Sequence, residues 1–132
     1  MKKKINDFEF AHDEQLTEYV IPDGVTEIGE GAFSGCTNLK KITITDSVTS
    51  IGDFAFWCCP SLQSITIPDG VTSIGKYAFE GCTSLQSVTI PDGVKEISLF
   101  AFWCCPSLKS VTIPRGCRYD DAFGENTKVF IR

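Results

Sequence analysis

The chain has 132 residues, enough for one domain, and 42% of them are hydrophobic, which excludes a disordered composition. The net charge is −5 and the pI is about 4.8. This acidic balance argues against direct binding of nucleic acid or of an anionic membrane, because both need a basic surface. Lys2, Lys3 and Lys4 are followed by polar residues instead of an apolar stretch. The sequence therefore predicts a cytoplasmic protein, or a cell-surface protein if a signal has been removed.

The first segment, residues 1–20, mixes Ile5, Phe8 and Phe10 with charged residues. It is interpreted as an N-terminal cap that covers the first coil of a repeating structure. Its last part, residues 16–21, has the spacing of a strand and forms a degenerate copy of the strands that follow.

A unit of 23 residues then repeats along the chain, with starts at Ile21, Ile44, Ile67, Ile90 and Ile113. Each of the first four units carries Ala-Phe eleven residues after its start. Such a strict period predicts a solenoid, in which each unit buries its apolar face against its neighbours. Residues 21–112 make four full repeats of this single domain.

One unit shows what each part does. In residues 62–67, Ile65 and Ile67 alternate with Ser64 and Thr66, which predicts a short strand with one buried face. Pro68-Asp69-Gly70 predicts a turn, and residues 71–74 predict a second short strand. Ala78-Phe79 is expected in a compact helical turn. Each coil should therefore hold two short parallel strands and one tight turn.

The last segment, residues 113–132, departs from the pattern. Asp120 stands where an isoleucine is expected, and Ala122-Phe123 comes two residues early. We expect a truncated repeat that ends in a covering strand at residues 129–131. Because the two ends both differ from the repeat, we expect a whole small protein with two caps and not an adhesin fragment.

The spaced residues of each unit resemble the BspA-type leucine-rich repeat, also called the Treponema pallidum type. The shared pattern is Leu-x-x-Ile-x-Ile-Pro-x-Gly-Val-x-x-Ile-Gly-x-x-Ala-Phe-x-Gly-Cys-x-x-Leu, and it covers residues 16 to about 117. The resemblance implies an α/β-type repeat solenoid: a leucine-rich-repeat horseshoe of short parallel strands, mostly β and turn with short helical turns. It also implies protein binding or adhesion, often on microbial surfaces, and no catalytic activity.

The seven cysteines follow the repeat. Cys36, Cys59, Cys82 and Cys105 are spaced by 23 residues and are interpreted as buried thiols that stack on one another. The other three cysteines are Cys58, Cys104 and Cys117, and Cys117 replaces a core valine. The odd count favours reduced thiols. No zinc site is expected, because the paired cysteines are adjacent instead of being spaced as Cys-x-x-Cys.

The sequence offers little for catalysis. The chain has one histidine, His12, and neither a nucleophile motif nor a glycine-rich phosphate loop. No catalytic residue, cofactor or metal ion is therefore expected. An aspartate recurs at the turn, and we interpret it as a turn residue whose carboxylate caps nearby amides, with Arg115 relieving the charge repulsion at the end. The four aspartates of this column are Asp23, Asp46, Asp69 and Asp92.

Two surfaces are candidate binding sites. The first, the aromatic edge, places tryptophan where other repeats have Ser34 and Glu80, beside an aromatic residue three positions earlier. Aromatic residues of this kind dominate interface hot spots, although they could instead fold back over neighbouring coils. The aromatic edge consists of Phe54, Trp57, Tyr77, Phe100 and Trp103.

The second surface, the concave face, consists of the outward side chains of the longer strands. Small polar residues suit an exposed sheet, and the concave side of a solenoid is its usual binding surface. Its candidate residues are Lys40, Lys41, Thr43, Ser64, Thr66, Ser87, Thr89, Ser110 and Thr112.

The sequence thus predicts a non-catalytic module that binds a protein partner through a repeated surface. Two alternatives stay open. One is a small acidic cytosolic inhibitor or decoy that blocks a basic surface such as a nuclease groove. The other is a self-associating structural module, with a homodimer formed through the aromatic edge, or a microbial surface adhesin fragment.

Overall fold

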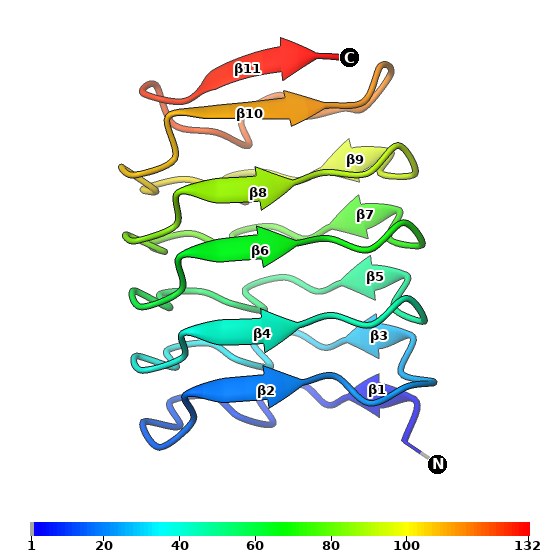
Figure 1. Cartoon of the computed structure of the whole chain (residues 1–132), viewed down its shortest axis with the longest axis vertical. Helices are drawn as coiled ribbons and strands as arrows, with labels where there is room; N and C mark the ends of the chain where they lie inside the picture. The colour runs from blue at the N-terminus through cyan, green and yellow to red at the C-terminus, as the bar shows by residue number, and fades with distance from the viewer. Residues whose placement is uncertain (1) are drawn as a thin grey trace.

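The computed structural model describes residues 2–132 and shows a stack of parallel coils, as predicted (Figure 1). Each coil except the last contributes a front strand and a shorter back strand that runs in the opposite direction in Figure 1. The front strands are β2 (Glu18–Val20), β4 (Lys41–Thr43), β6 (Ser64–Thr66), β8 (Ser87–Thr89), β10 (Ser110–Ile113) and β11 (Lys128–Ile131). The back strands are β1 (Lys4–Ile5), β3 (Glu27–Ile28), β5 (Ser50–Ile51), β7 (Ser73–Ile74) and β9 (Glu96–Ile97).

The back strands form one continuous parallel sheet in the order β1-β3-β5-β7-β9. Residues 23 positions apart face each other at every step, such as Ile28 opposite Ile51 and Ile51 opposite Ile74. The period of the sequence is therefore also the register of the sheet.

The core is a set of side-chain columns that run the length of the stack. The largest is a phenylalanine column, in which Phe33, Phe56, Phe79 and Phe102 are fully buried. Neighbouring rings in it lie parallel with centroids 4.9 to 5.1 Å apart. This separation matches the spacing between strands, so each ring stacks on its copy in the next coil.

The turn that carries Ala-Phe is not helical, which corrects the expected short helical turns: residues 2–132 contain no helix. Alternate amides bond in different directions. Ala55 and Trp57 donate to carbonyls three residues back, whereas Phe54, Phe56 and Cys58 donate to carbonyls of the next coil. A helix needs all of these amides for bonds within its own segment, so bonding between coils excludes it.

Two positions in each of these turns have a left-handed backbone. One column of positive φ consists of Phe8, Gly31, Phe54, Tyr77 and Phe100, and the other of His12, Gly35, Cys58, Gly81 and Cys104. Amides at both positions donate to the next coil, as from Phe54 to the Lys76 carbonyl and from Cys58 to the Glu80 carbonyl, both at 2.8 Å.

Three of the four full repeats have an Ile-Gly pair where two coils approach closely, and the fourth has Ile97-Ser98. A Cβ atom on Gly75 would lie 2.5 Å from the backbone of Gly52 and Asp53. At Gly75 glycine is therefore favoured by the lack of space between backbones and not by its conformational freedom, although Ser98 occupies the same position in the fourth repeat.

The first segment follows the same geometry as the repeats. Ile5 pairs with Ile28 in the back sheet, and Phe10 stacks on Phe33 with centroids 5.2 Å apart. Residues 4–20 thus extend the sheet and the phenylalanine column, in addition to ending the stack.

The last coil closes in fewer residues than the others. Arg118 bridges Glu96, Phe123 stacks on Phe102 with centroids 5.3 Å apart, and Lys128 pairs with Ser110. The partners in these three contacts are therefore 22, 21 and 18 residues apart in sequence, compared with 23 residues in the other coils. The expected final strand at residues 129–131 is present as part of β11.

The front strands pair in twos: β2 with β4, β6 with β8 and β10 with β11. Within residues 2–132, no ladder of hydrogen bonds joins β4 to β6 or β8 to β10. Both interruptions precede a strand that follows a Cys-Cys-Pro turn. In these turns a serine hydroxyl donates to the preceding coil, from Ser61 to the Thr37 carbonyl and from Ser107 to the Thr83 carbonyl.

Candidate binding surfaces

The structure brings the five residues of the predicted aromatic edge together. Phe54 and Tyr77 are stacked with centroids 4.9 Å apart, and Tyr77 contacts Phe100 at 5.4 Å. Trp57 packs edge-on against Phe54 at 6.3 Å, and Trp103 packs against Phe100 at 4.9 Å. All five side chains are half-buried, so each ring both covers a neighbouring coil and presents a face to solvent.

The two tryptophans have different surroundings. The indole Nε1 of Trp57 donates to Glu80 Oε1 of the next coil at 2.7 Å. The last coil, which follows Trp103, does not keep the 23-residue register of the other coils. Within residues 2–132, no carboxylate accepts a hydrogen bond from the Trp103 indole as Glu80 does from Trp57. The indole of Trp57 is therefore fixed by a polar bond as well as by packing.

Two apolar residues beside this edge were missed by the sequence analysis. Phe8 belongs to the same column and is 56% exposed, with its ring over the Cα of Gly31. Leu99 precedes Phe100 and is 39% exposed. The signal for Phe8 was present, because it lies two repeat lengths before Phe54.

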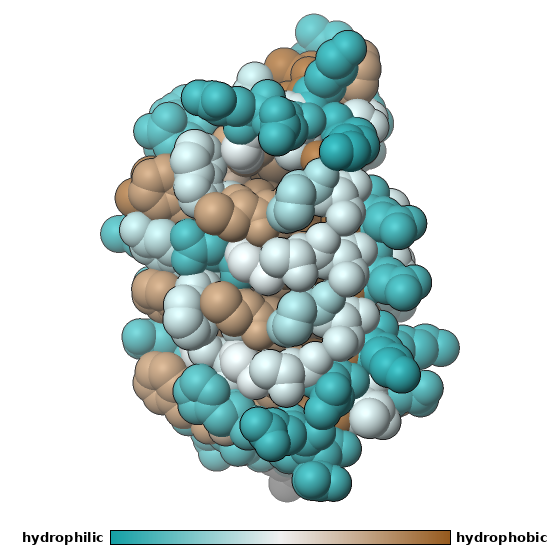
Figure 2. Space-filling model, turned by 90° about the vertical axis from the view of Figure 1, so that its left-hand side faces the viewer, coloured by the Kyte–Doolittle hydropathy of each residue, from teal (hydrophilic) through white to brown (hydrophobic). Residues whose placement is uncertain are grey.

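The difference between the Cys-Cys-Pro and Gly-Cys turns has a packing reason. Cys58 Sγ lies 3.0 Å from where a Cβ on Gly81 would be, and the His12 ring covers Gly35 in the same way. Larger side chains thus alternate with glycine along this column. Figure 2 shows the face that carries these turns, where hydrophobic side chains alternate with pale and hydrophilic ones along the stack.

The concave face is exposed as predicted: Lys41, Ser64, Ser87 and Ser110 all lie on its surface, as do the threonines beside them. The two interruptions between front strands are hollowed. A cavity of about 300 Å³ between β4 and β6 is lined by Lys40, Lys41 and Asp46 among others. A second, of about 350 Å³, lies between β8 and β10 and reaches Arg132.

The cysteine column is buried, and its members are free thiols. Each thiol donates to the carbonyl of a phenylalanine in the preceding coil, as from Cys59 to Phe33 and from Cys82 to Phe56, both at 3.2 Å. Burial raises the pKa of the thiols of Cys59 and Cys105 to about 12. These cysteines therefore act as neutral donors that fill the core.

The aspartate column is exposed, and its interpretation was wrong in two respects. None of its four carboxylates accepts a backbone amide among the described residues; the turn is closed by backbone bonds such as Val71 to Pro68 at 3.1 Å. The cation at its end is Arg132, which bonds Asp92 at 2.8 Å, and not Arg115. In the part of the chain that the structure describes, no three His, Cys, Asp or Glu side chains gather as metal ligands.

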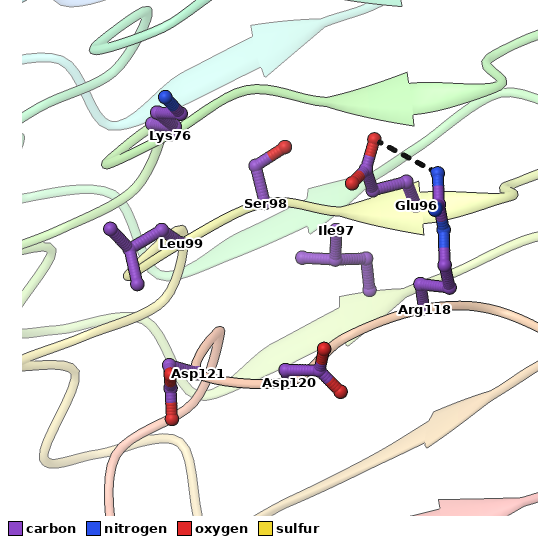
Figure 3. Close-up of a pocket in the computed structure, with 8 residues that line it drawn as sticks. All are labelled: Lys76, Glu96, Ile97, Ser98, Leu99, Arg118, Asp120 and Asp121. Carbon is purple, nitrogen blue, oxygen red and sulfur yellow. Dashed lines mark ion pairs between the residues drawn. The ribbon is translucent and has the colours of Figure 1, made fainter.

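A cavity of about 350 Å³ opens where the last coil leaves the register (Figure 3). Glu96 and Arg118 form an ion pair at 3.7 Å on one side of it, and Asp120 and Asp121 lie on the other. Asp120 occupies the position of the core isoleucine of earlier coils, so the back sheet ends here with charged side chains.

Solved structures share this architecture. The Leucine Rich Repeat protein of T. pallidum is 31% identical with a TM-score of 0.82, over 97% of this chain and 66% of that protein. A leucine-rich repeat protein from Bacteroides ovatus is 28% identical with a TM-score of 0.77, over 96% of this chain and 44% of that protein. A leucine rich cell surface protein from Faecalibacterium prausnitzii is 31% identical with a TM-score of 0.66, over 85% of this chain and 39% of that protein.

A comparison with curated protein sequences finds no match. Within residues 2–132, nothing has the length and apolar character of a membrane-crossing helix. Residues 3–129 match the family described as BspA type Leucine rich repeat region (6 copies). Together with the coil geometry and the solved relatives, this match shows that the chain belongs to the BspA-type leucine-rich repeat family.

Proposed function

We propose that this chain is a non-catalytic module that binds a protein partner through the aromatic edge. Leucine-rich repeat solenoids are commonly protein-binding, and their extended surfaces suit a macromolecule better than a small substrate. The choice of surface depends on one observation: the backbone conformation of the aromatic residues.

Phe54, Tyr77 and Phe100 have φ between 58 and 59°. A bulky residue in this left-handed region is strained by about 1–2 kcal/mol. Glycine avoids the strain, and Gly31 occupies the same column with φ 61°. Stacking between the rings offsets part of the strain, at about 0.5–1.5 kcal/mol for a pair. The fold thus accepts glycine in this column, and the aromatic side chains are not needed for the backbone conformation. Their presence therefore favours a role in binding at the surface.

The geometry suits recognition. The five rings are held by one another and by the bond from Trp57 to Glu80, so they lose little freedom on binding. Tyrosine and tryptophan are also the residues that contribute most at protein interfaces. We therefore assign the contact to this pre-ordered edge.

The test begins with capture of a partner from native lysate, identified by mass spectrometry. Trp57→Ala combined with Trp103→Ala should weaken its binding from nanomolar to micromolar, since each anchor contributes about 2 kcal/mol or more. The matched control places charges on the other surface, with Ser64→Glu and Ser87→Glu. Loss of binding in the control alone would overturn the aromatic edge as the site.

The concave face is the second candidate, supported by the hollows at the two interruptions of its sheet. The hollow between β4 and β6 combines open strand edges with Lys40 and Lys41. If it is the site, the charged control variants abolish binding and the tryptophan variant does not.

Two further outcomes distinguish the remaining functions. An inhibitor of a basic partner would show binding that falls steeply with salt, because exposed charges are screened over about 10 Å at 0.1 M. A homodimer through the aromatic edge would appear by light scattering of the purified protein and would be lost in the tryptophan variant.

We also propose a reducing compartment for this chain, consistent with a cytoplasmic location. The supporting observation is that all seven cysteines are free thiols. The relative from F. prausnitzii is described as a cell surface protein, and a surface location here would make adhesion the alternative. Cell fractionation with an antibody against the chain tests the location: recovery in the envelope fraction would contradict our proposal.

A further inference from the structure

Four of the five exposed large hydrophobic side chains of residues 2–132 lie at the two ends of the stack. The five are Phe8 at 56%, Val20 at 63%, Leu99 at 39%, Phe130 at 54% and Ile131 at 56% exposed. All but Leu99 belong to the first or last coil. Solenoids usually end in coils with polar outer faces, because an apolar end invites association.

The front face shows the same change along two columns of outward side chains. One column has threonine in all four inner strands, at Thr43, Thr66, Thr89 and Thr112, but begins with Val20 and ends with Phe130. The neighbouring column begins with Glu18 and ends with Lys128. The two ends are thus apolar in one column and opposite in charge in the next.

Both terminal front strands also have a free edge. Among the described residues, β2 pairs only with β4, and β11 pairs only with β10. A free edge is a row of unpaired amides and carbonyls that can accept another strand.

We propose that β11 of one copy pairs with β2 of a second copy, in a parallel, head-to-tail contact. Continuing the register of the stack places Lys128 opposite Glu18, Val129 opposite Tyr19 and Phe130 opposite Val20 of the second copy. The contact therefore combines strand pairing with one ion pair and burial of two of the most exposed apolar side chains.

The two basic side chains behind these strands are already paired within each copy. Lys4 at one end already pairs with Asp7 and Glu27, and Arg118 at the other end pairs with Glu96. The last coil has left the back-sheet register, so the contact is confined to the front strands.

The two surfaces of this contact differ from each other, so it does not close into a dimer. Such heterologous contacts produce rings or open filaments. This inference is independent of the proposed partner binding, because it uses none of the five residues of the aromatic edge.

Light scattering of the purified full chain over a range of concentrations tests the contact. We expect the mean mass to rise with concentration, and Val20→Asp or Phe130→Asp to raise the dissociation constant at least about tenfold, because each places an unpaired carboxylate in the contact. Thr66→Asp, in the same column but in the middle of the stack, is the matched control and should associate like the unmodified chain. Far-ultraviolet circular dichroism confirms that each variant is folded.

Mixing the two end variants gives the sharpest result. Val20→Asp retains an intact β11 end, and Phe130→Asp retains an intact β2 end, so the mixture should form a one-to-one pair that grows no further. Three outcomes overturn the contact: an unmodified chain that stays monomeric to about 1 mM, association that both variants leave unchanged, or association of Val20→Asp alone through two β11 strands. Trp57→Ala with Trp103→Ala should leave the association unchanged.

Discussion

At the scale of single residues, the left-handed aromatic positions are the least ordinary feature of this chain. Phe54, Tyr77 and Phe100 adopt positive φ, and their amides donate to carbonyls of the next coil, Lys76 in the case of Phe54. Phe56 makes the same kind of bond without positive φ, so the left-handed backbone belongs to particular positions of the turn, where the side chain has to tolerate it.

This conformation predicts an unusual order of stability for substitutions at Phe54. Both Phe54→Gly and Phe54→Ala remove the ring, but only glycine relieves the strain of φ 59°. We expect the glycine variant to be about 1 kcal/mol more stable than the alanine variant, as measured by urea denaturation. The same pair of changes at Thr49, on the outside of the coil, is the control and should favour alanine. An alanine variant at Phe54 equal to or above glycine would show that the left-handed backbone carries no strain.

The cysteines are predicted to react in the order of their exposure. Cys104 is exposed and Cys58 is half-buried, whereas Cys59 and Cys82 are fully buried. Burial raises the pKa of the thiols of Cys59 and Cys82, which suppresses the reactive thiolate. Timed alkylation followed by mass spectrometry should label Cys104 first, then Cys58, and the column only on unfolding. Rapid labelling of all seven cysteines, or a disulfide within the column, would contradict this core.

At the scale of elements, the turn that carries Ala-Phe works as a third ladder beside the front and back strands. Phe54, Phe56 and Cys58 each donate to the next coil, as strand residues do, although the segment is not a strand. Coils whose front strands also pair are therefore joined on three sides, and coils at the two interruptions of the front sheet are joined on two. This arrangement explains why the phenylalanine column inside the turn is so regular.

Adjacent residues of this turn should differ strongly in their effect on stability. Phe56→Ala removes a fully buried ring from the column and should cost about 3–5 kcal/mol. Trp57→Ala removes a half-buried indole and its bond to Glu80, and should cost about 1–2 kcal/mol. Urea denaturation of both variants measures the difference. Equal losses would place Trp57 in the core and remove the case for the aromatic edge.

At the scale of the whole molecule, the buried thiols make the stability of the fold depend on pH in the alkaline range. The pKa of Cys59 and of Cys105 is raised to about 12 by burial, and that of Cys82 is raised in the same direction. The folded chain therefore holds protons that the unfolded chain releases. The stability contributed by the protonated thiols is complete below about pH 8.5 and is lost as the pH rises towards the folded values.

We expect the free energy of unfolding to decrease between about pH 8.5 and 12, by about 1.4 kcal/mol per pH unit for each buried thiol. Cys82→Ala should remove the contribution of one thiol to this slope. The packing that the substitution removes should lower the free energy of unfolding by the same amount at every pH. Urea titrations of both proteins across this range provide the comparison. Equal slopes would mean that the column does not bury its thiols.

Much of the fold could be predicted from the period of the sequence. A spacing of 23 residues determines which side chains lie above one another, so the two strands of each coil, the phenylalanine and cysteine columns and the outward concave residues followed from it. The members of the aromatic edge were also found, because Trp57 and Trp103 replace polar residues of other repeats. The division at residues 20 and 112 into cap, repeats and truncated repeat stays a prediction, as does the choice of binding surface.

Other features were decided only by the tertiary structure, because they depend on which atoms of two coils meet. The turn that was expected to be helical contains left-handed residues instead. The front strands are separated into pairs by the interruptions of their sheet. Phe130 and Ile131 are exposed in the shortened last coil. The partner of Asp92 is Arg132 and not the expected Arg115. A repeat in the sequence specifies neighbours to within one residue, whereas a hydrogen bond requires the position of individual atoms. The sequence by itself therefore determined the columns of this solenoid, and the contacts between coils decided its turns, its edges and its ends.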